Sequence, residues 1–480
     1  MDRFLCIHGH FYQPPREDPR TGEIAPEPSA QPYANWNERI TAECYRPLVE
    51  RGIYPRMSFD FGPTLLSWLE KKEPQVYRAV IDADKESQKR FSGHGSAMAQ
   101  AYNHIILPLA NRRDRVTQVV WGARDFEWRF GRKPEGMWLP ETAVDLESLE
   151  ILAERGIAFT VLAPHQAERV RFPPHGNWKK EGGIDSRRAY ELRLPSKRRI
   201  RLFFYDGNIA QGLAFGGLAA DGPGLAARVR QVFSSEPSQA QLVHAACDGE
   251  TFGHHHKGGD KALEEVLRQF EQDKEIGLTN YGEYLEKHPA IHEVEIVEKS
   301  SWSCPHGIDR WWSNCGCSSG AHPGWSQEWR TPLRNGLDEL RDSVAERYEQ
   351  EAAKLVKDPW AARDHSIDLW LDSSPESRRR FLDANASHAL SAEEQERLWK
   401  LLELQQHALF MYTSCGWFFD DISGIEAVLV LRCAARVIRL SEELFGFSPE
   451  ARFLEILAEA KSNDPAAGDG RKVYEMRVAR

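Results

Sequence analysis

Alternating strand-like and helix-like patterns fill roughly the first 290 residues of the chain. Short apolar runs typical of buried strands are separated by longer segments with helical periodicity. This alternation predicts an α/β fold with a parallel sheet, open or closed, whose chemistry lies at the carboxyl ends of its strands. We expect strands at 4–7, 56–61, 135–139, 157–162, 200–205 and 241–246, and helices at 63–70, 114–129, 145–155, 226–233 and 260–272.

The pattern changes near residue 329. Residues 333–355, 391–412 and 425–444 are helically periodic and poor in strand signals. Before them, residues 298–328 are rich in Trp, Cys and Gly and lack clear periodicity, and an irregular segment of this length is often functional or metal-stabilised. We therefore predict three parts, which are a catalytic domain at 1–297, the irregular segment at 298–328 and a mostly α-helical domain at 329–480.

Composition excludes some classes of partner. The formal net charge of −10 disfavours nucleic acid or an anionic membrane as the main partner, whereas a neutral polymer would not be repelled. No apolar stretch is long enough to span a bilayer, and the N-terminal apolar run is interpreted as the first strand rather than a leader. The 8 cysteines in 480 residues do not resemble a secreted disulfide framework, so we expect a cytoplasmic protein with reduced thiols.

Two apolar runs, 136–141 and 245–250, end in acidic residues beside Gly or Pro. They offer Glu141 in the first case and Asp248 and Glu250 in the second. Two facing carboxyls are the minimum equipment for cleaving a glycosidic bond, because one must be ionised and the other must hold a proton. The alternative is that both segments merely cap helices. We interpret Glu250 as a hydrogen-bond partner of the acid rather than a catalytic group.

His8 and His10 end the first apolar run and lie two residues apart, so on a strand they point to the same side. They could donate hydrogen bonds to sugar hydroxyls, or bind a metal together with Asp248 and His254. A purely structural role at a strand end is the third interpretation. His104, beside Asn103, is either a sugar contact or part of a helix entry.

The irregular segment contains Cys304, His306, Cys315 and Cys317. Three thiolates and an imidazole are a suitable ligand set for Zn²⁺, although the C-x-H and C-x-C spacings depart from the usual zinc patterns. The sequence therefore allows a structural zinc site here, against the alternative of unbound thiols in a loop.

An aromatic and acidic stretch at 411–421 interrupts the helical part. Trp417 would suit a sugar-binding surface, because tryptophan offers a flat apolar face. Asp420 and Asp421 would be costly in a core if unpaired, so we expect them at the rim of a cleft.

Five segments, 8–14, 102–109, 136–141, 248–254 and 415–421, resemble in this order the motifs of glycoside hydrolase family 57. That resemblance implies a distorted (β/α)7-type barrel followed by a helical domain, and retaining activity on α-glucans as a hydrolase or a glucanotransferase. It implies no cofactor and no catalytic metal. The Cys-rich insert is not general to the family and indicates a distinct subgroup.

By the same resemblance Glu141 matches the catalytic nucleophile and Asp248 the general acid/base, and their carboxyls should lie about 5–5.5 Å apart. Glu141, when ionised, should raise the pKa of Asp248. His10 matches a sugar contact, and Trp138 lies in the nucleophile motif. The substrate contacts we expect are His8, His10, His104, Trp138, Asp206, Glu250, His254, Trp417, Asp420 and Asp421.

Two other functions compete with this interpretation. A metal-dependent carbohydrate deacetylase would use His8, His10, Asp248 and His254 as metal ligands. A catalytically idle glucan-binding protein would keep the cleft without turning over substrate.

Overall fold

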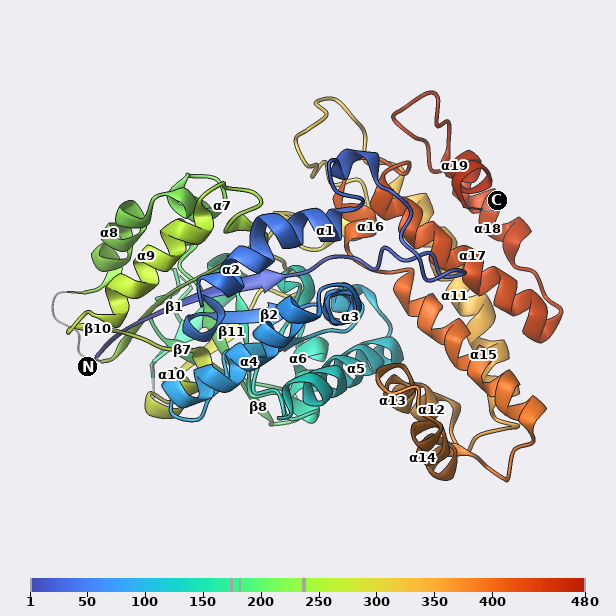
Figure 1. Ribbon diagram of the computed structural model, residues 1–480, viewed down its shortest axis with the longest axis horizontal. Coiled ribbons are helices and arrows are strands. Elements are labelled where there is room, and N and C mark those ends of the chain that lie inside the picture. The colour runs from blue at the N-terminus through green and yellow to red at the C-terminus, as the bar shows by residue number, and fades with distance from the viewer. Residues whose placement is uncertain (1, 173–175, 181–182, 235–238, 479–480) are drawn as a thin grey trace. The chain divides into compact units, whose positions relative to one another are not determined.

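The computed structural model describes residues 2–172, 176–180, 183–234 and 239–478. The chain divides into two compact units (Figure 1). Unit 1 consists of Met1–Gln13, Pro26–Ala101 and Phe126–Trp302, and unit 2 consists of Pro14–Ala25, Tyr102–Asp125 and Ser303–Arg480. Nothing in the order of the sequence patterns indicated that two N-terminal segments belong with the C-terminal helices.

Seven parallel strands form a closed ring in unit 1. From β9 the order of pairing runs through β1, β2 and β3 to β4, all in parallel. A parallel bridge between Gly136 and Phe159 continues the ring to β5, which pairs in parallel with β8. The Asp206 amide donates to the His244 carbonyl at 2.8 Å and connects the end of β8 to β9. The ring is a distorted (β/α)7 barrel, and the predicted fold is confirmed. Its strands are β1 (Arg3–Phe11), β2 (Ser58–Phe61), β3 (Ala97–Gln100), β4 (Met137–Trp138), β5 (Phe159–Leu162), β8 (Arg199–Phe204) and β9 (Gln241–Asp248).

Four further strands extend the barrel. β7 (Ala189–Arg193) pairs antiparallel with β8, β11 (His292–Ile296) joins β7, and β6 (Ala167–Arg171) joins β11, while β10 (Ile276–Leu278) pairs with the start of β1. Helices lie around the strands (Figure 1). They are α1 (Trp36–Ile40), α2 (Arg46–Glu50), α3 (Pro63–Lys72), α4 (Pro74–Arg90), α6 (Leu146–Glu154), α7 (Gly207–Ala214), α8 (Gly222–Val232), α9 (Gly259–Glu271), α10 (Tyr281–Lys287) and the last part of α5 (Arg112–Phe130).

Alternate residues of the strands fill the barrel. Phe4 and Cys6 of β1 pack in one buried cluster with side chains of the other barrel strands, including Trp138, Phe203 and Leu242. The period of two continues along β1 to His8 and His10, which therefore share a side with this core. We expected the first strand to end at residue 7, but β1 runs to Phe11 and contains both histidines. β4 is shorter than expected, with two residues.

Unit 2 is mostly helical, as predicted. Its three long helices match the expected ranges closely, and α15 begins at a capping box in which Ser391 and Glu394 satisfy each other's backbone amides. The buried Arg363 guanidinium pairs with Asp114 at 2.8 Å. Residues 303–328 contain one short 3-10 turn, Asp309–Trp311, and are otherwise irregular. The helices are α11 (Arg330–Ala352), α12 (Pro359–His365), α13 (Ile367–Leu371), α14 (Pro375–Asn385), α15 (Ala392–Phe410), α16 (Cys415–Phe418), α17 (Ile425–Phe445), α18 (Glu450–Leu457) and α19 (Gly470–Arg477).

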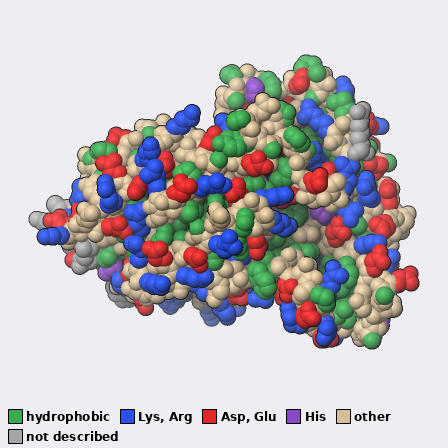
Figure 2. Space-filling view, viewed as in Figure 1, with side chains coloured by type: hydrophobic (Ala, Val, Ile, Leu, Met, Phe, Trp, Pro, Cys, Tyr) green, Lys and Arg blue, Asp and Glu red, His purple; other side chains and the backbone are tan. Residues whose placement is uncertain are grey.

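Charged side chains of both signs are interspersed over the face shown in Figure 2. This agrees with a composition of 62 basic and 72 acidic residues. Within the described ranges, no helix combines the length and apolar character needed to cross a membrane.

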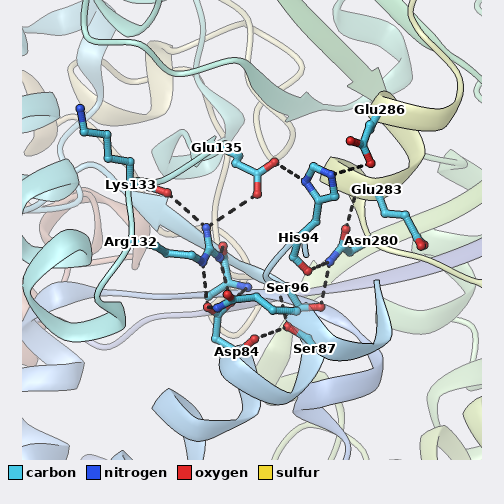
Figure 3. A network of polar contacts seen from close by, with 12 residues as sticks. Asp84, Ser87, His94, Ser96, Arg132, Lys133, Glu135, Asn280, Glu283 and Glu286 are labelled. Atoms are coloured by element: carbon cyan, nitrogen blue, oxygen red, sulfur yellow. Dashed lines mark hydrogen bonds and ion pairs between the residues drawn. The ribbon is translucent and has the colours of Figure 1, made fainter. Parts of the chain in front are cut away.

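A polar network fixes the start of β3 (Figure 3). Asp84 on α4 is fully buried and accepts hydrogen bonds from the Ala97 amide and from Arg132, each at 2.8 Å. Arg132 also donates to the Ala97 carbonyl. The buried carboxylate is therefore paired with a charged guanidinium, which offsets the cost of burying it.

His94 lies at the partly exposed side of the same network. Its Nδ1 contacts Glu135, which precedes β4, at 2.7 Å, and its Nε2 contacts Glu286 on α10 at 3.1 Å (Figure 3). Partial burial lowers the pKa of His94, but the two carboxylates outweigh this effect and raise it above 6.5. The ring, whose protonated form the two carboxylates favour, therefore links three elements near the amino-terminal ends of the barrel strands.

We expect His94→Ala to destabilise the protein more at low pH than at high pH. A folded-state pKa above the unfolded value gives a stabilisation that is complete below about pH 6.5 and is lost as the pH rises through the folded pKa. Urea unfolding should show a loss of about 1 kcal/mol at pH 6 and a smaller loss at pH 9. His388→Ala, which removes an exposed histidine paired with Glu394, serves as the control. Equal losses at both pH values would contradict the assignment.

Candidate active site

Three ionisable side chains line up across neighbouring strands. In the parallel register, His10 of β1 lies opposite Asp60 of β2 on one side and opposite Asp248 of β9 on the other. Because parallel strands end at the same edge of a sheet, all three residues lie at the carboxyl-terminal edge of the barrel. This is the edge at which barrels of this kind carry their functional residues.

Asp60 connects the two histidines. Its Oδ2 contacts His10 Nδ1 at 2.9 Å and its Oδ1 contacts His8 Nε2 at 3.0 Å, while His8 Nδ1 contacts the Ser58 hydroxyl at 3.0 Å. Asp60 and His8 are fully buried. Both ring nitrogens of His8 are thus engaged by the protein beneath the edge of the barrel.

The two histidines differ in charge. Burial lowers the pKa of His8 by more than Asp60 raises it, so this ring is neutral. Burial also acts to lower the pKa of His10, but Asp60, Asp248 and Glu250 together raise it to about 9. His10 is therefore a cation at neutral pH, surrounded by carboxylates.

Asp248 is the last residue of β9. Its side chain reaches solvent, yet surrounding protein displaces enough water to raise its pKa above 3.8. His10 opposes this rise and Asp60 adds to it. The pKa rises as predicted, but the cause differs from the expected one, because burial and Asp60 raise it rather than Glu141.

Glu250 lies just beyond Asp248 and is buried. It accepts a hydrogen bond from the Tyr45 hydroxyl at 2.5 Å. Burial and the neighbouring Asp248 raise the pKa of Glu250 to about 7. Gly249 allows the chain to turn here, since a Cβ atom at this position would lie 2.1 Å from the Phe11 ring.

Glu141 follows β4 in a tight 3-10 turn and has a left-handed backbone, with φ 57° and ψ 20°. Thr142 also has a positive φ of 50°. Such angles are strained for residues other than glycine and persist where the surroundings enforce them. Here the Trp302 amide donates to the Glu141 carbonyl at 3.0 Å, and the Gln166 side chain exchanges two hydrogen bonds of 2.8 Å with Thr142.

The Glu141 carboxylate is held by an aromatic donor. Trp302 Nε1 donates to its Oε2 at 2.9 Å. The Trp302 ring in turn contacts the rings of His10 and Trp138, with centroids 6.1 and 5.2 Å away. Glu141 is therefore connected to His10 through Trp302, which contacts both residues. Asp248 interacts electrostatically with His10. The separation of Glu141 and Asp248 stays a prediction.

Trp138 lies beneath the site rather than on its surface. It is fully buried and stacks on His8 and His10 at centroid distances of 4.7 and 5.2 Å. This position suits a support for the two histidines better than a platform for a sugar ring.

Two other expected contacts in unit 1 have local partners. His254 Nδ1 contacts Glu43 at 2.5 Å, and Asp206 caps α7 by accepting from the Ile209 amide at 2.8 Å. The metal-site alternative required His254 beside His8, His10 and Asp248. Among residues that the structure describes, the one group arranged to hold a metal is elsewhere, in unit 2, so the geometry does not support a catalytic metal at this set.

The remaining expected contacts belong to unit 2. His104 Nδ1 contacts the Ser414 hydroxyl at 2.6 Å, and the Trp417 indole donates to the Arg330 carbonyl. Asp420 and Asp421 are buried, so their expected rim position is wrong. The Asp420 carboxylate accepts hydrogen bonds from the amide and hydroxyl of Ser319, and the Asp421 carboxylate accepts from the Ser462 hydroxyl and the Asn463 amide. Burying these carboxylates is therefore not costly in the way that burying unpaired ones would be.

Asp60, Tyr45 and Trp302 contact the ionisable groups of the site but were not among the expected site residues. Asp60 had a usable signal, because a lone acid between Phe59 and Phe61 in a short strand is costly unless it is paired. Tyr45 and Trp302 had none, since each reaches its carboxylate from a distant part of the chain.

Comparison with known proteins agrees with this barrel fold. Residues 18–296, which are more than half of the chain, match the model of glycosyl hydrolase family 57. The protein therefore belongs to this family, and the predicted resemblance is confirmed. Residues 325–480 match a second model, described as a domain of unknown function (DUF3536).

Solved structures share the fold at low sequence identity. An exo-type maltose-forming amylase from Pyrococcus sp. ST04 superposes with a TM-score of 0.70 at 16% identity, over 96% of this chain and 83% of that one. A branching enzyme from Pyrococcus horikoshii gives a TM-score of 0.61 at 17% identity, over 96% and 95% of the two chains.

Curated relatives are longer than this chain. A 4-α-glucanotransferase of Thermococcus litoralis is 23% identical over an alignment of 308 residues that covers 57% of this chain and 41% of the relative. An α-amylase of Pyrococcus horikoshii is 24% identical over an alignment of 309 residues that covers 60% of this chain and 44% of the relative. The chain thus spans less than half the length of these relatives.

We expect Asp60→Asn to lower the pKa of His10 from about 9. The substitution removes the negative charge that favours the imidazolium, and burial continues to disfavour it, so the pKa should fall by at least about one unit. A pH titration of the His10 ring signal by NMR measures the change. Asp221→Asn, at the exposed cap of α8, is the control and should leave the pKa near 9. An unchanged value in Asp60→Asn would refute the proposed pairing.

Proposed function

We propose that the protein is a retaining glycosidase or glucanotransferase acting on α-glucans, with Glu141 as nucleophile and Asp248 as general acid/base. The observation that carries the proposal is the pair of carboxylates at the ends of β4 and β9, in two different environments around one histidine cation. Family membership supports it, as do the names of the relatives, which are α-amylases, a 4-α-glucanotransferase and a branching enzyme.

The first chemical step uses the difference between the two carboxyls. Ionised Glu141 attacks the anomeric carbon and forms a glycosyl ester, while Asp248 gives its proton to the glycosidic oxygen, which leaves as the hydroxyl of the departing glucan. Trp302 favours this assignment, because a hydrogen-bond donor to a carboxylate stabilises its ionised form. The raised pKa of Asp248 favours its protonated form, as the proposed acid requires.

The second step reverses the roles. Ionised Asp248 takes a proton from water or from the hydroxyl of another glucan, whose oxygen attacks the anomeric carbon and releases Glu141. Water gives hydrolysis, and a glucan hydroxyl gives transfer. The charge of His10 stabilises Asp248 while it is ionised between the two steps.

The other residues support this pair. His8, with both nitrogens engaged, orients Asp60, and Asp60 holds His10 as a cation beside the reacting groups. Glu250 and Tyr45 fix the chain beyond Asp248. His10 remains the residue of this set that we expect to donate a hydrogen bond to a sugar hydroxyl.

We also propose a cytoplasmic location. All the cysteines are free thiols, which supports a reducing compartment.

We expect Glu141→Gln to lower turnover of maltoheptaose or amylose by at least about 10³-fold, because the amide cannot form the ester intermediate. Products are resolved by chain length and linkage. Shorter sugars alone mean hydrolysis, a ladder of shorter and longer sugars means transfer, and new branch points mean branching.

The control is Glu154→Gln on α6, an exposed residue that should leave turnover unchanged. Circular dichroism should show both variants folded. Wild-type protein that leaves every glucan unchanged would reject the proposal, and so would full activity in Glu141→Gln.

A second prediction concerns pH. The alkaline limb of the profile of kcat/KM should follow loss of the proton from Asp248. His10 lowers the pKa of Asp248, so His10→Gln should raise this pKa and shift the alkaline limb to higher pH, together with a fall in kcat. A limb that stays in place or moves to lower pH contradicts the assignment of Asp248 as the acid.

A further inference from the structure

Three thiols and one imidazole of unit 2 converge on a single point. The ligand atoms of Cys304, His306, Cys315 and Cys317 all lie within 4.8 Å of one another. Cys304 Sγ is 3.9 Å from Cys315 Sγ and 3.7 Å from Cys317 Sγ, and Cys317 Sγ is 3.6 Å from His306 Nδ1. Cys304 is buried, Cys315 and Cys317 are half-buried, and His306 is exposed.

These distances match the edges of a zinc tetrahedron. Zn–S bonds of about 2.3 Å at tetrahedral angles place sulfur atoms about 3.8 Å apart. With a Zn–N bond of about 2.0–2.1 Å, the distance from sulfur to nitrogen is about 3.6 Å. The observed distances of 3.6, 3.7 and 3.9 Å therefore fit four ligands of one ion.

Other uses of the thiols fit less well. A disulfide would bring two sulfur atoms to about 2.05 Å, and all the cysteines are free. The four ligands of an iron–sulfur cluster are spread over two or more iron atoms, so as a set they would lie farther apart than the ligands of one ion. Four protein ligands leave no open position for a substrate, which is the arrangement of a structural rather than a catalytic zinc.

The loop is shaped around these ligands. Gly307 follows His306 and has a left-handed φ of 83°. Gly316 lies between Cys315 and Cys317 and has a left-handed φ of 81°. Backbone groups of Arg310 and His306 hydrogen-bond to the Cys304 sulfur. Donors of this kind stabilise a thiolate over a thiol.

The same loop is tied to the helical core of unit 2. Arg330 donates to the Cys317 carbonyl at 2.8 Å, and the Ser319 amide donates to Asp420 at 2.7 Å. Arg310 donates to the Phe418 carbonyl at 2.8 Å and lies over the Phe418 ring. A fixed loop would thus hold the 418–420 segment in place.

We propose that Cys304, His306, Cys315 and Cys317 bind one Zn²⁺ ion, which fixes the 304–317 loop and the segment attached to it. Residues 303–328 have almost no regular secondary structure, so a metal supplies order that backbone pairing does not. Free energy of metal binding is then free energy of folding for this part of the chain.

The test is the metal content of the full-length protein, purified without added metal and measured by mass spectrometry. We expect about one zinc ion per chain, with loss of most of it in Cys315→Ser and full retention in Cys415→Ser, a half-buried cysteine outside the group. Cobalt substituted for zinc should give the thiolate charge-transfer and visible bands of a tetrahedral site.

A second measurement applies if Cys315→Ser does not fold. Chelator treatment of the wild-type protein should lower its Tm and increase hydrogen exchange of residues 303–320, and added Zn²⁺ should reverse both changes. Absence of stoichiometric metal, iron in place of zinc, or a Tm and exchange pattern unaffected by metal removal would each overturn the proposal. None of these outcomes depends on glucan turnover.

Discussion

The candidate site depends on the register of β1, which pairs in parallel with β2 on one side and with β9 on the other. This register puts Asp60, His10 and Asp248 at one level of the barrel. A shift by one residue would turn the histidines of β1 away from the core side and separate all three groups. The apolar residues Phe4 and Cys6 lock the register, because they share a face with His8 and His10 and are buried in the barrel core. Packing at one end of the strand therefore positions the ionisable groups at the other.

Electrostatics then gives each group a separate state. Burying a carboxylate without a partner is costly, and Asp60 is fully buried. Its contact with His10 offsets that cost and makes His10 a cation with a pKa of about 9, while the deeper His8 stays neutral. The cation in turn limits how far the pKa of Asp248 rises. An Asp248 with a raised pKa beside a charged His10 suits the proposed acid/base, which must gain and lose a proton in one cycle.

Much of this could be predicted from the sequence. Short apolar runs located β5, β8 and β9, and helical periodicity located α3, α6 and the three long helices of unit 2. The glycine- and proline-bounded acids Glu141 and Asp248 were placed correctly at strand ends.

What could not be predicted depends on contacts between distant residues. Tyr45 reaches Glu250 across 205 positions and Trp302 reaches Glu141 across 161, and no local pattern carries such pairings. The rim position expected for Asp420 and Asp421 was wrong for the same reason, since their partners Ser319, Ser462 and Asn463 come from other segments.

The backbone of Glu141 gives a final argument for its role. A left-handed conformation at a residue other than glycine costs about 1–3 kcal/mol, and glycine would avoid the cost. The chain instead keeps a glutamate there and fixes the turn from both sides, with Trp302 on its carbonyl and carboxylate and Gln166 on Thr142. β4 ends only three residues earlier, so the turn sets where the carboxylate lies relative to the barrel. Backbone strain that distant residues hold in place is expected where the direction of a side chain matters more than local stability. A nucleophile must meet an anomeric carbon in line, so this condition applies to the role proposed for Glu141.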